Sequence, residues 1–313
     1  DGQTPGWVYA TNPLYADQMG SFCRYIGANT DQYPDPVVGY ISWPGAFGEA
    51  AFTPETISYC AAQGVTILET PEYFLPSATD ITTNVQNLID AGANILYSNA
   101  LASGPFMVAK TVSDLGLDDE IQVAGVNWAL DTSVGLLSRT ALGSDGLPAV
   151  NGLIGSLPFY WWNERDQPGI QLINEQAALN ERGLSTQNIA YLLGWSIADL
   201  YIEMYTQTLN RVGSLDAVTG AEIKATLDSM VYSPLGLFNL DYRGEEIRAL
   251  PGNRIAQMLF LNADQTGPAT SGDDAMTVPL PDGTTAYIPI LVPLTSFEDA
   301  PDLRPGGADV PAS

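Results

Sequence analysis

Four hydrophobic runs recur at nearly equal spacing in the first half of the chain, and this spacing constrains the fold more than any other feature. The runs begin at Val37, Val65, Asn94 and Ile121, at intervals of 28, 29 and 27 residues. The helix-compatible segments between them are residues 49–63, 80–91 and 104–115. Strands that alternate with helices at this spacing predict βαβ crossovers and a parallel sheet that is covered on both faces.

The middle helical segment shows the pattern most clearly. Asp80 is a residue type that caps the N-terminus of a helix, and Gly92 is one that ends a helix. Between them the apolar residues fall on one face of a helix, at Ile81, Val85, Leu88 and Ile89. We therefore expect an amphipathic helix that packs on the predicted sheet.

Beyond residue 150 the pattern changes. The run "VNGLIGSLPFYWW" predicts a strand that leaves the first sheet. Three helices are then expected, at residues 170–180, 186–214 and 219–230, and strands around a turn follow at residues 236–244 and 254–267. The three helices have apolar faces but no predicted sheet of their own, so something else should pack against them.

Composition argues against several classes of function. The 36 Asp and Glu against 11 Lys and Arg give a formal net charge of −25, which would repel a phosphate backbone, so nucleic acid is not an expected partner. The chain has no histidine, the commonest general base and the commonest zinc ligand. A hydrolase would have to use carboxylates such as Glu49, Glu69 or Glu72, which stand at no convincing catalytic spacing. We therefore expect neither enzyme activity nor a metal or other cofactor.

The two cysteines, Cys23 and Cys60, are too few for a cysteine zinc site or an iron–sulfur cluster. They can pair as one disulfide outside the cytoplasm, or remain two buried free thiols. The best candidate for a membrane span, "AYIPILVPL", is short and interrupted by proline, so the sequence predicts no span.

Several segments, taken in order, resemble a known family. They are the turn "WPGAFGEA", the run "DITTNVQNLIDAGANILYSNALASGPFMVAKTVSDLGL", the turn "VAGVNW" and the helical run "YLLGWSIADLYIEMYTQTLNRVGSLDAVTGAEIKATLDSM". The chain resembles the type I periplasmic substrate-binding proteins, specifically the branched-chain amino-acid (Leu/Ile/Val-binding) group that serves ABC importers. The resemblance implies an α/β fold of two doubly wound, Rossmann-like lobes with a small ligand gripped between them.

The resemblance starts part-way into the family pattern. Roughly a hundred residues that would build most of one lobe's sheet have no counterpart before Asp1, judged by ordinary domain sizes. We therefore expect that lobe to be incomplete, with an N-terminal segment or a companion chain supplying the rest. The implied division is a crossover strand at residues 1–12, a complete α/β lobe at 13–152 joined by strands from about 236–300, helices and a strand of the other lobe at 153–235, and a loose tail at 301–313.

The candidate ligand site follows from the predicted sheet. In doubly wound sheets, ligands bind beyond the carboxyl ends of the strands, a rule that selects the turns at residues 43–48, 98–103, 127–130 and, less directly, 69–73. Within these turns the resemblance implies ligand contacts by Phe47, Gly48, Asn99, Ala100, Leu101, Ala102, Asn127 and Trp128.

Asn127 bears on the kind of ligand. Amino-acid-binding members of the family have an acidic side chain there for the ammonium group of the ligand, and an amide cannot neutralise a buried ammonium. The sequence therefore favours a neutral or weakly polar ligand, or an amide, over a plain branched-chain amino acid. Structural interpretations stand beside this one, because Gly48 can simply shape a turn, and Phe47 and Trp128 can be packing residues.

These expectations combine into one function, that of an extracytoplasmic solute-binding protein. It would capture a small polar or amino-acid-like molecule by hinge closure and present it to the membrane subunits of an ABC importer. Its expected location is the periplasm or the cell surface, where a lipid anchor on the missing N-terminus is one means of attachment. The alternative is a sensor or a self-assembling cell-surface protein that reuses the same fold.

Overall fold

The computed structural model describes residues 6–245, 247–249, 252–280 and 282–311. The chain folds into two compact units. One, here called the sheet unit, comprises residues 15–157, 254–296 and 301–313. The other, here called the helical unit, comprises residues 1–14, 158–253 and 297–300.

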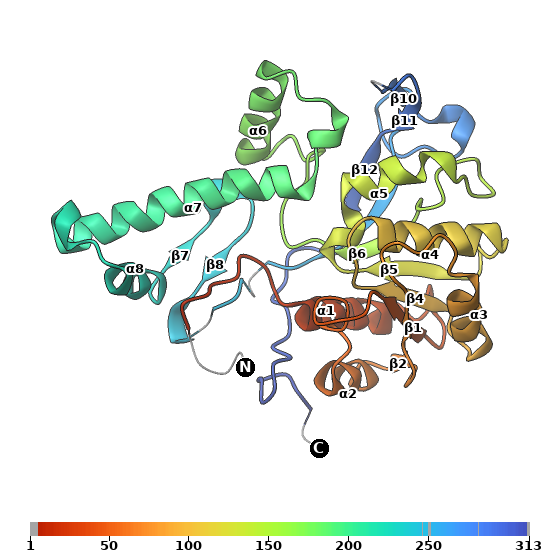
Figure 1. The fold of residues 1–313 in the computed structure, drawn as a ribbon, viewed down its shortest axis with the longest axis horizontal. Coiled ribbons are helices and arrows are strands. Elements are labelled where there is room, and N and C mark those ends of the chain that lie inside the picture. Colours follow the sequence, from red (N-terminus) through yellow and green to blue (C-terminus); the bar gives the residue numbers. More distant parts are fainter. Residues whose placement is uncertain (1–5, 246, 250–251, 281, 312–313) are drawn as a thin grey trace. The chain divides into compact units, whose positions relative to one another are not determined.

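The sheet unit is built on one large sheet with the strand order β12-β9-β6-β5-β4-β1-β2 (Figure 1). These strands are β1 (Val37–Ser42), β2 (Thr66–Ile67), β4 (Ile95–Ser98), β5 (Gln122–Gly125), β6 (Ile154–Ser156), β9 (Ile255–Phe260) and β12 (Pro289–Pro293). Neighbours from β2 to β6 are parallel, whereas β9 pairs antiparallel with both β6 and β12. The short β3 (Glu72–Tyr73) pairs parallel with the end of β1, and β10 (Thr277–Pro279) and β11 (Thr285–Tyr287) form a separate antiparallel pair.

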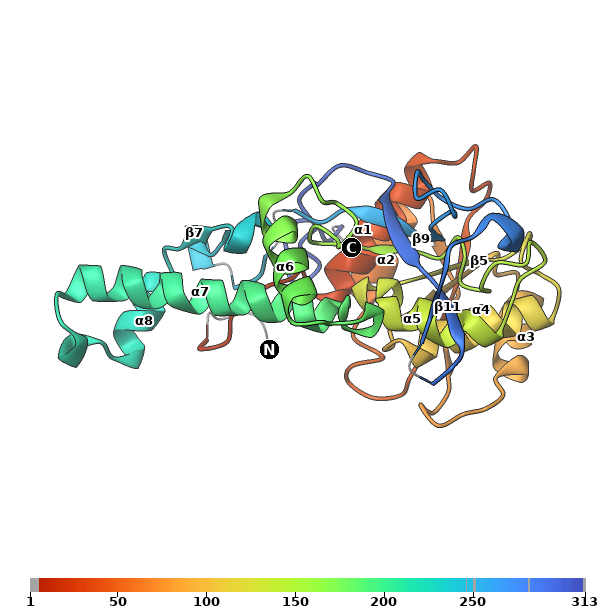
Figure 2. The same ribbon diagram turned by 90° about the horizontal axis from the view of Figure 1, so that it is seen from above.

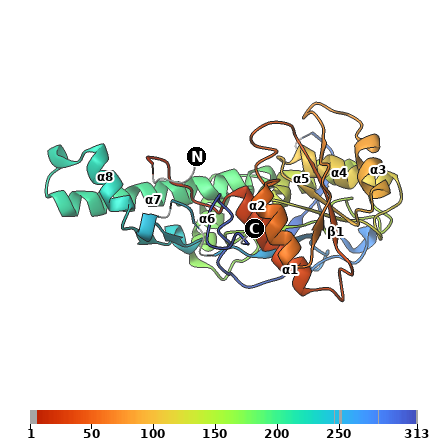
Figure 3. The same cartoon turned by 90° about the horizontal axis from the view of Figure 1, so that it is seen from below.

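Helices cover both faces of this sheet. The helices α3 (Thr82–Asp90), α4 (Ser103–Asp114) and α5 (Thr132–Leu137) lie on one face (Figure 2). The opposite face is covered by α1 (Tyr15–Ala28) and α2 (Pro54–Ala62) (Figure 3). The parallel strands and helix-covered faces confirm the α/β fold class predicted from the spacing of the hydrophobic runs. In the described part of the chain, no helix combines the length and apolar character needed to cross a bilayer.

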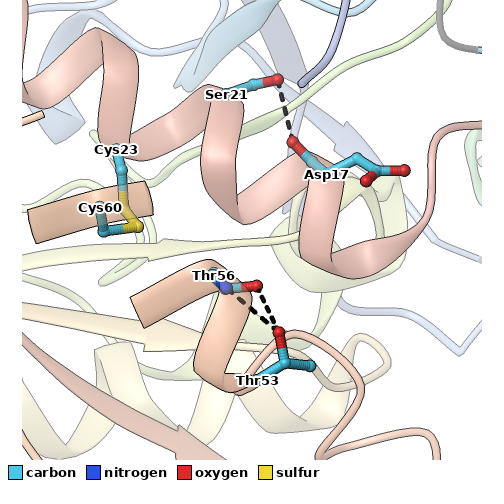
Figure 4. Close-up of a disulfide and its surroundings, with 6 residues drawn as sticks. All are labelled: Asp17, Ser21, Cys23, Thr53, Thr56 and Cys60. Atoms are coloured by element: carbon cyan, nitrogen blue, oxygen red, sulfur yellow. Dashed lines mark hydrogen bonds between the residues drawn. A yellow bond between two sulfur atoms is a disulfide. The ribbon is translucent and has the colours of Figure 1, made fainter. Parts of the chain in front are cut away.

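A disulfide joins α1 to α2, the two helices that cover the same face of the sheet (Figure 4). Cys23 and Cys60 are both fully buried, and their Cα atoms lie 5.2 Å apart. Of the two alternatives that the sequence left open, the structure therefore contains the bonded pair. α2 begins immediately after Thr53, whose hydroxyl accepts a hydrogen bond from the backbone N–H of Thr56 at 3.2 Å.

The helical unit contains α6 (Pro168–Leu179), α7 (Ile189–Val212) and α8 (Gly220–Leu227), with a two-stranded sheet of β7 (Val231–Tyr232) and β8 (Leu240–Asp241). α7 begins after Asn188, whose side chain accepts from the N–H of Tyr191, and ends at the left-handed Gly213. α7 and α8 are joined through the buried hydroxyls of Thr208 and Thr226, 2.8 Å apart.

α7 also has apolar side chains that this unit leaves exposed. Tyr201 and Ile202 are 56% and 67% exposed, and Ile197 and Tyr205 are exposed as well. Of the apolar stripe that the sequence predicts along this helix, Ile189, Leu193 and Met204 are buried and only Ile197 is exposed, so most of the exposed apolar side chains lie outside that stripe. A monomeric soluble protein seldom leaves such residues clustered in the open.

Two strand predictions need correction. The strand expected to leave the first sheet is β6, which instead extends that sheet by pairing with β5 and β9. The strands expected around a turn at residues 236–244 and 254–267 do not pair with each other, because β8 pairs with β7. β9 is mostly buried along its length and therefore belongs inside the large sheet.

The starts of two helices also differ from the prediction. The helix expected at residues 49–63 begins only at Pro54, because residues 47–51 form turns. Ile81, not Asp80, stands at the N-cap position of α3, although the Asp80 carboxylate accepts from the N–H of Thr82 at 2.8 Å.

The predicted crossover strand has no strand geometry at residues 6–12, and its residues 1–5 lie outside the described residues. The tail expected to be loose packs on the sheet unit instead. Leu303 is 2% exposed, and its N–H donates to the Asp17 carboxylate at 3.0 Å.

Candidate functional site

The candidate site lies where the strand order of the sheet reverses. β1 is followed along the chain by β2 on one side and, after α3, by β4 on its other side. The connections after β1 and β4 therefore run to opposite faces of the sheet. A crevice forms at such a switch point beyond the carboxyl ends of the strands, and it is the usual ligand position in doubly wound sheets.

The turn after β1 depends on glycine. Gly45 has the positive φ of +96°, and its N–H donates to the Glu49 carboxylate at 2.8 Å. A Cβ atom on Gly48 would lie 1.9 Å from the carbonyl oxygen of Trp43, so no larger residue fits there without moving the backbone. The two glycines hold the turn in a shape that brings Phe47 to the switch point.

A hydrogen bond links the two turns across the switch point. The side-chain N–H of Asn99, directly after β4, donates to the carbonyl oxygen of Phe47 at 2.7 Å. The hydroxyl of Ser42, the last residue of β1, donates to the backbone carbonyl of Asn99 at 2.5 Å. Asn99 therefore fixes the position of Phe47, and its amide oxygen is buried without a partner in the described part of the chain.

Asn127 follows β5 and opens a short 3-10 helix (Asn127–Leu130). Its backbone N–H donates to the Gln18 side chain of α1 at 2.9 Å. The Asn127 side chain is 1% exposed, and neither its oxygen nor its nitrogen has a hydrogen-bond partner among the described residues. Because buried polar atoms are nearly always paired, an unpaired amide at the end of a strand indicates a place for a ligand or water.

Aromatic side chains from the same turns and from α1 contact one another. The Phe47 ring lies 6.4 Å from that of Trp43 and makes an edge contact of 5.2 Å with that of Tyr15. The Tyr15 hydroxyl in turn accepts a hydrogen bond from the indole N–H of Trp128 at 3.1 Å. Burial raises the pKa of the Tyr15 hydroxyl and the Trp128 hydrogen bond lowers it in part, so this hydroxyl stays protonated at neutral pH. We call Trp43, Phe47, Asn99, Asn127 and Trp128 together the switch-point wall.

The other predicted ligand-contact residues are less well placed to contact a ligand at the wall. Ala100 is fully buried and faces α4, because a Cβ on Gly104 would lie 2.3 Å from its own Cβ. Gly48 is buried within the turn, whereas Leu101 is 44% exposed and presents its side chain beside the start of α4.

Two residues of α1, Tyr15 and Gln18, contact the wall although no sequence pattern marks them. They precede Asn127 by more than a hundred residues in the chain. Only the packing of α1 against the sheet brings them to the wall.

Two of the three carboxylates named for a hydrolase, Glu49 and Glu72, are engaged in structural contacts. Glu49 accepts from the N–H of Gly45. Glu72 accepts from the amides of Asn84 and Asn87 at 2.7 and 2.8 Å. Within the described ranges, no group of three His, Cys, Asp or Glu side chains is arranged to hold a metal ion.

Solved structures of other proteins share the fold of this chain. A branched-chain amino acid ABC transporter protein from Thermus thermophilus with bound valine aligns with 93% of this chain and 67% of its own, at 17% identity and a TM-score of 0.67. A substrate-binding protein from Aeropyrum pernix aligns with 94% of this chain and 66% of its own, at 16% identity and a TM-score of 0.64. A fatty acid ABC transporter substrate-binding protein from Thermomonospora curvata aligns with 99% of this chain and 69% of its own, at 14% identity and a TM-score of 0.66.

This chain thus spans about two thirds of the length of the solved chains. Comparison with curated proteins found no match. At these low identities the solved structures establish the fold alone, and the family is shown by a different comparison. The model of the family described as "Periplasmic binding protein" matches residues 1–266. The chain therefore belongs to the periplasmic binding protein family, with the type I fold.

Proposed function

We propose that this chain is the ligand-binding part of an extracytoplasmic solute-binding protein that delivers a small molecule to an ABC importer. The observation that carries the proposal is the switch-point wall, where the turns after neighbouring strands hold both aromatic rings and buried, unpaired and uncharged polar atoms. A small ligand held against this wall by a second surface would cover the rings and pair the polar atoms. Closure around the ligand would then mark the loaded protein for the importer.

The wall favours a neutral ligand with both hydrogen-bond donors and acceptors. Asn127 offers an N–H and a carbonyl oxygen, and Asn99 offers a carbonyl oxygen. None of the five wall residues is charged. A buried ammonium group would be left without a counter-charge there, which is costly. We therefore infer a small, weakly polar or amide-like ligand, in contrast to the valine bound by the Thermus thermophilus protein.

Replacing Asn127 by Asp is expected to change this preference. The protein from its source should bind isovaleramide, a neutral amide, more tightly than leucine. Asn127→Asp introduces a carboxylate of nearly the same shape, so leucine affinity should rise by about tenfold and isovaleramide affinity should fall. Isothermal titration calorimetry of both compounds on both proteins measures these changes.

Asn94→Asp is the matched control for this experiment. Asn94 lies at the opposite end of β4, where its side chain contacts the backbone before β1, so this change should leave the ratio of the two affinities unchanged. If the unchanged protein already binds leucine more tightly and Asn127→Asp has no effect, the wall does not select the ligand.

The exposed apolar face of α7 fits the same function. Tyr201, Ile202 and Tyr205 are exposed on a helix of the unit that lacks a large sheet. We propose that polypeptide equivalent to the remaining third of the solved relatives packs on this face, as a further segment or a companion chain. Covering these side chains would complete the second lobe.

Native mass spectrometry of the protein from its source tests both proposals together. We expect a chain or complex heavier than the 33.4 kDa of this sequence, carrying a small molecule of low mass. Large assemblies of a single 33.4 kDa chain without a ligand would instead favour the self-assembling surface protein.

A further inference from the structure

A cavity lies at the N-terminal ends of strands β4 and β5. The switch-point wall lies at the opposite, carboxyl ends of the strands. The volume of the cavity is about 390 Å³, within the range of small-molecule sites. Residues before β1, β4 and β5 line it, together with the segment that leads into β6. The proposed importer function gives this cavity no role.

Three side-chain amides line the cavity, and the amide nitrogen of each donates to another protein group. The amide nitrogens of Gln122 and Gln257 both donate to the carbonyl oxygen of Gly152, at 3.0 and 3.1 Å. The Asn151 amide nitrogen donates to the Asp145 carboxylate at 3.1 Å. Turning any of these amides would bring two oxygens together, so the contacts fix their orientation. Each amide therefore presents a carbonyl oxygen as an acceptor, and that of Asn151 is buried without a partner in the part of the chain described.

Tyr33 adds a buried polar atom to the same lining. This side chain is 8% exposed, and its ring is held by an edge contact with Tyr25 at 6.1 Å. Its hydroxyl makes no hydrogen bond of ordinary length with the residues described, and burial, with a smaller contribution from the nearby Tyr25 hydroxyl, raises its pKa. A buried hydroxyl without a partner carries a desolvation cost that a ligand would remove.

The charged side chains that line the cavity are all acidic. Asp118, Asp119 and Glu120 line the cavity, and no Lys or Arg occurs among its described lining residues. An anionic ligand would therefore meet both negative charge and hydrogen-bond acceptors.

We propose that this cavity binds a small organic cation with several N–H donors, of the amine or guanidinium class. The oxygens of Gln122, Asn151 and Gln257 would accept its N–H groups, and the carboxylates at Asp118 and Glu120 would balance its charge. The Tyr33 hydroxyl would complete the set of acceptors. This site is independent of the proposed importer function, because it uses none of the residues of the switch-point wall.

Agmatine, which carries a guanidinium and an ammonium group, is a suitable probe. Isothermal titration calorimetry of the full chain should show saturable binding of agmatine but none of succinate, and only weak binding of the neutral butylurea. Tyr33→Phe removes only the hydroxyl and should weaken agmatine binding by about tenfold. The double variant Asp118→Asn/Glu120→Gln should weaken it by at least as much, and more strongly at low salt than at high salt.

Tyr97→Phe is the matched control, because Tyr97 is fully buried and its hydroxyl is also unpaired in the described chain, yet it does not line the cavity. Its agmatine affinity should equal that of the unchanged protein. Thermal unfolding of every variant checks that the sheet unit remains folded.

Three results would overturn the proposal. One is the absence of saturable agmatine binding, and another is equally tight binding of succinate. The third is binding that is lost in Asn127→Ala and kept in Tyr33→Phe, which would place the cation at the switch-point wall.

Discussion

Removing the disulfide between Cys23 and Cys60 should lower the free energy of unfolding of the sheet unit by about 3–4 kcal/mol, the loop-closure effect expected for this separation. The bond spans 37 residues and joins α1 to α2. Without it the unfolded chain gains freedom, while the folded unit retains its other contacts. Urea unfolding of the Cys23→Ala/Cys60→Ala variant, followed by circular dichroism, measures the change.

Chemical reduction of the unchanged protein provides the control for this variant. It opens the same loop but leaves both sulfur atoms in place, so it separates loss of the covalent bond from the small cavities that alanine creates. Titration of thiols in denaturant should detect none before reduction and two after it. Two thiols before reduction, with no change in stability on adding reductant, would show that the cysteines are free.

Gly48→Ala should destabilise the sheet unit by about 3 kcal/mol, because the added methyl group has no space. Its Cβ would lie 1.9 Å from the Trp43 carbonyl oxygen and 2.7 Å from the carbonyl carbon, and a backbone group cannot turn aside as a side chain can. The turn would have to open, which would also displace Phe47 from the switch-point wall. Urea unfolding gives the stability of the variant.

Gly194→Ala is the comparison for this substitution. Gly194 lies inside α7, and a Cβ there would meet no atom of the described residues within 4 Å. Alanine should therefore stabilise that helix by about 0.5–1 kcal/mol, as is usual for an exposed helix interior. Equal stability of Gly48→Ala and the unchanged protein would mean that the turn relaxes readily and that Gly48 is not required for its shape.

The regular spacing of hydrophobic runs was sufficient to predict four of the parallel strands, β1, β2, β4 and β5. Each of these strands is a local segment with its own pattern, so β1, β4 and β5 could be located from their residues alone. The pairing of β6 and β9 could not be predicted in the same way. Pairing partners far apart in the sequence are chosen by burial and register, which a short apolar run does not encode.

The candidate site was predictable to a similar extent. The rule that ligands bind beyond strand ends located Phe47, Asn99 and Asn127 in their turns. The same rule contains no information on Tyr15 and Gln18, whose contacts depend on how α1 packs against the sheet. The disulfide likewise depends on tertiary packing, because α1 and α2 bring the Cα atoms of Cys23 and Cys60 to 5.2 Å from each other. The sequence alone left bonded and free cysteines as alternatives.

The unpaired amide of Asn127 gives the wall a property that a charged residue would lack. A primary amide can rotate by half a turn about its last bond, which exchanges its oxygen and its nitrogen with almost no change in shape. Since neither atom is held by another described residue, either orientation is open to it. The same backbone can therefore meet a carbonyl group in one ligand and an N–H group in another. Under the proposed function, this one side chain would let a single site accept several chemically related ligands.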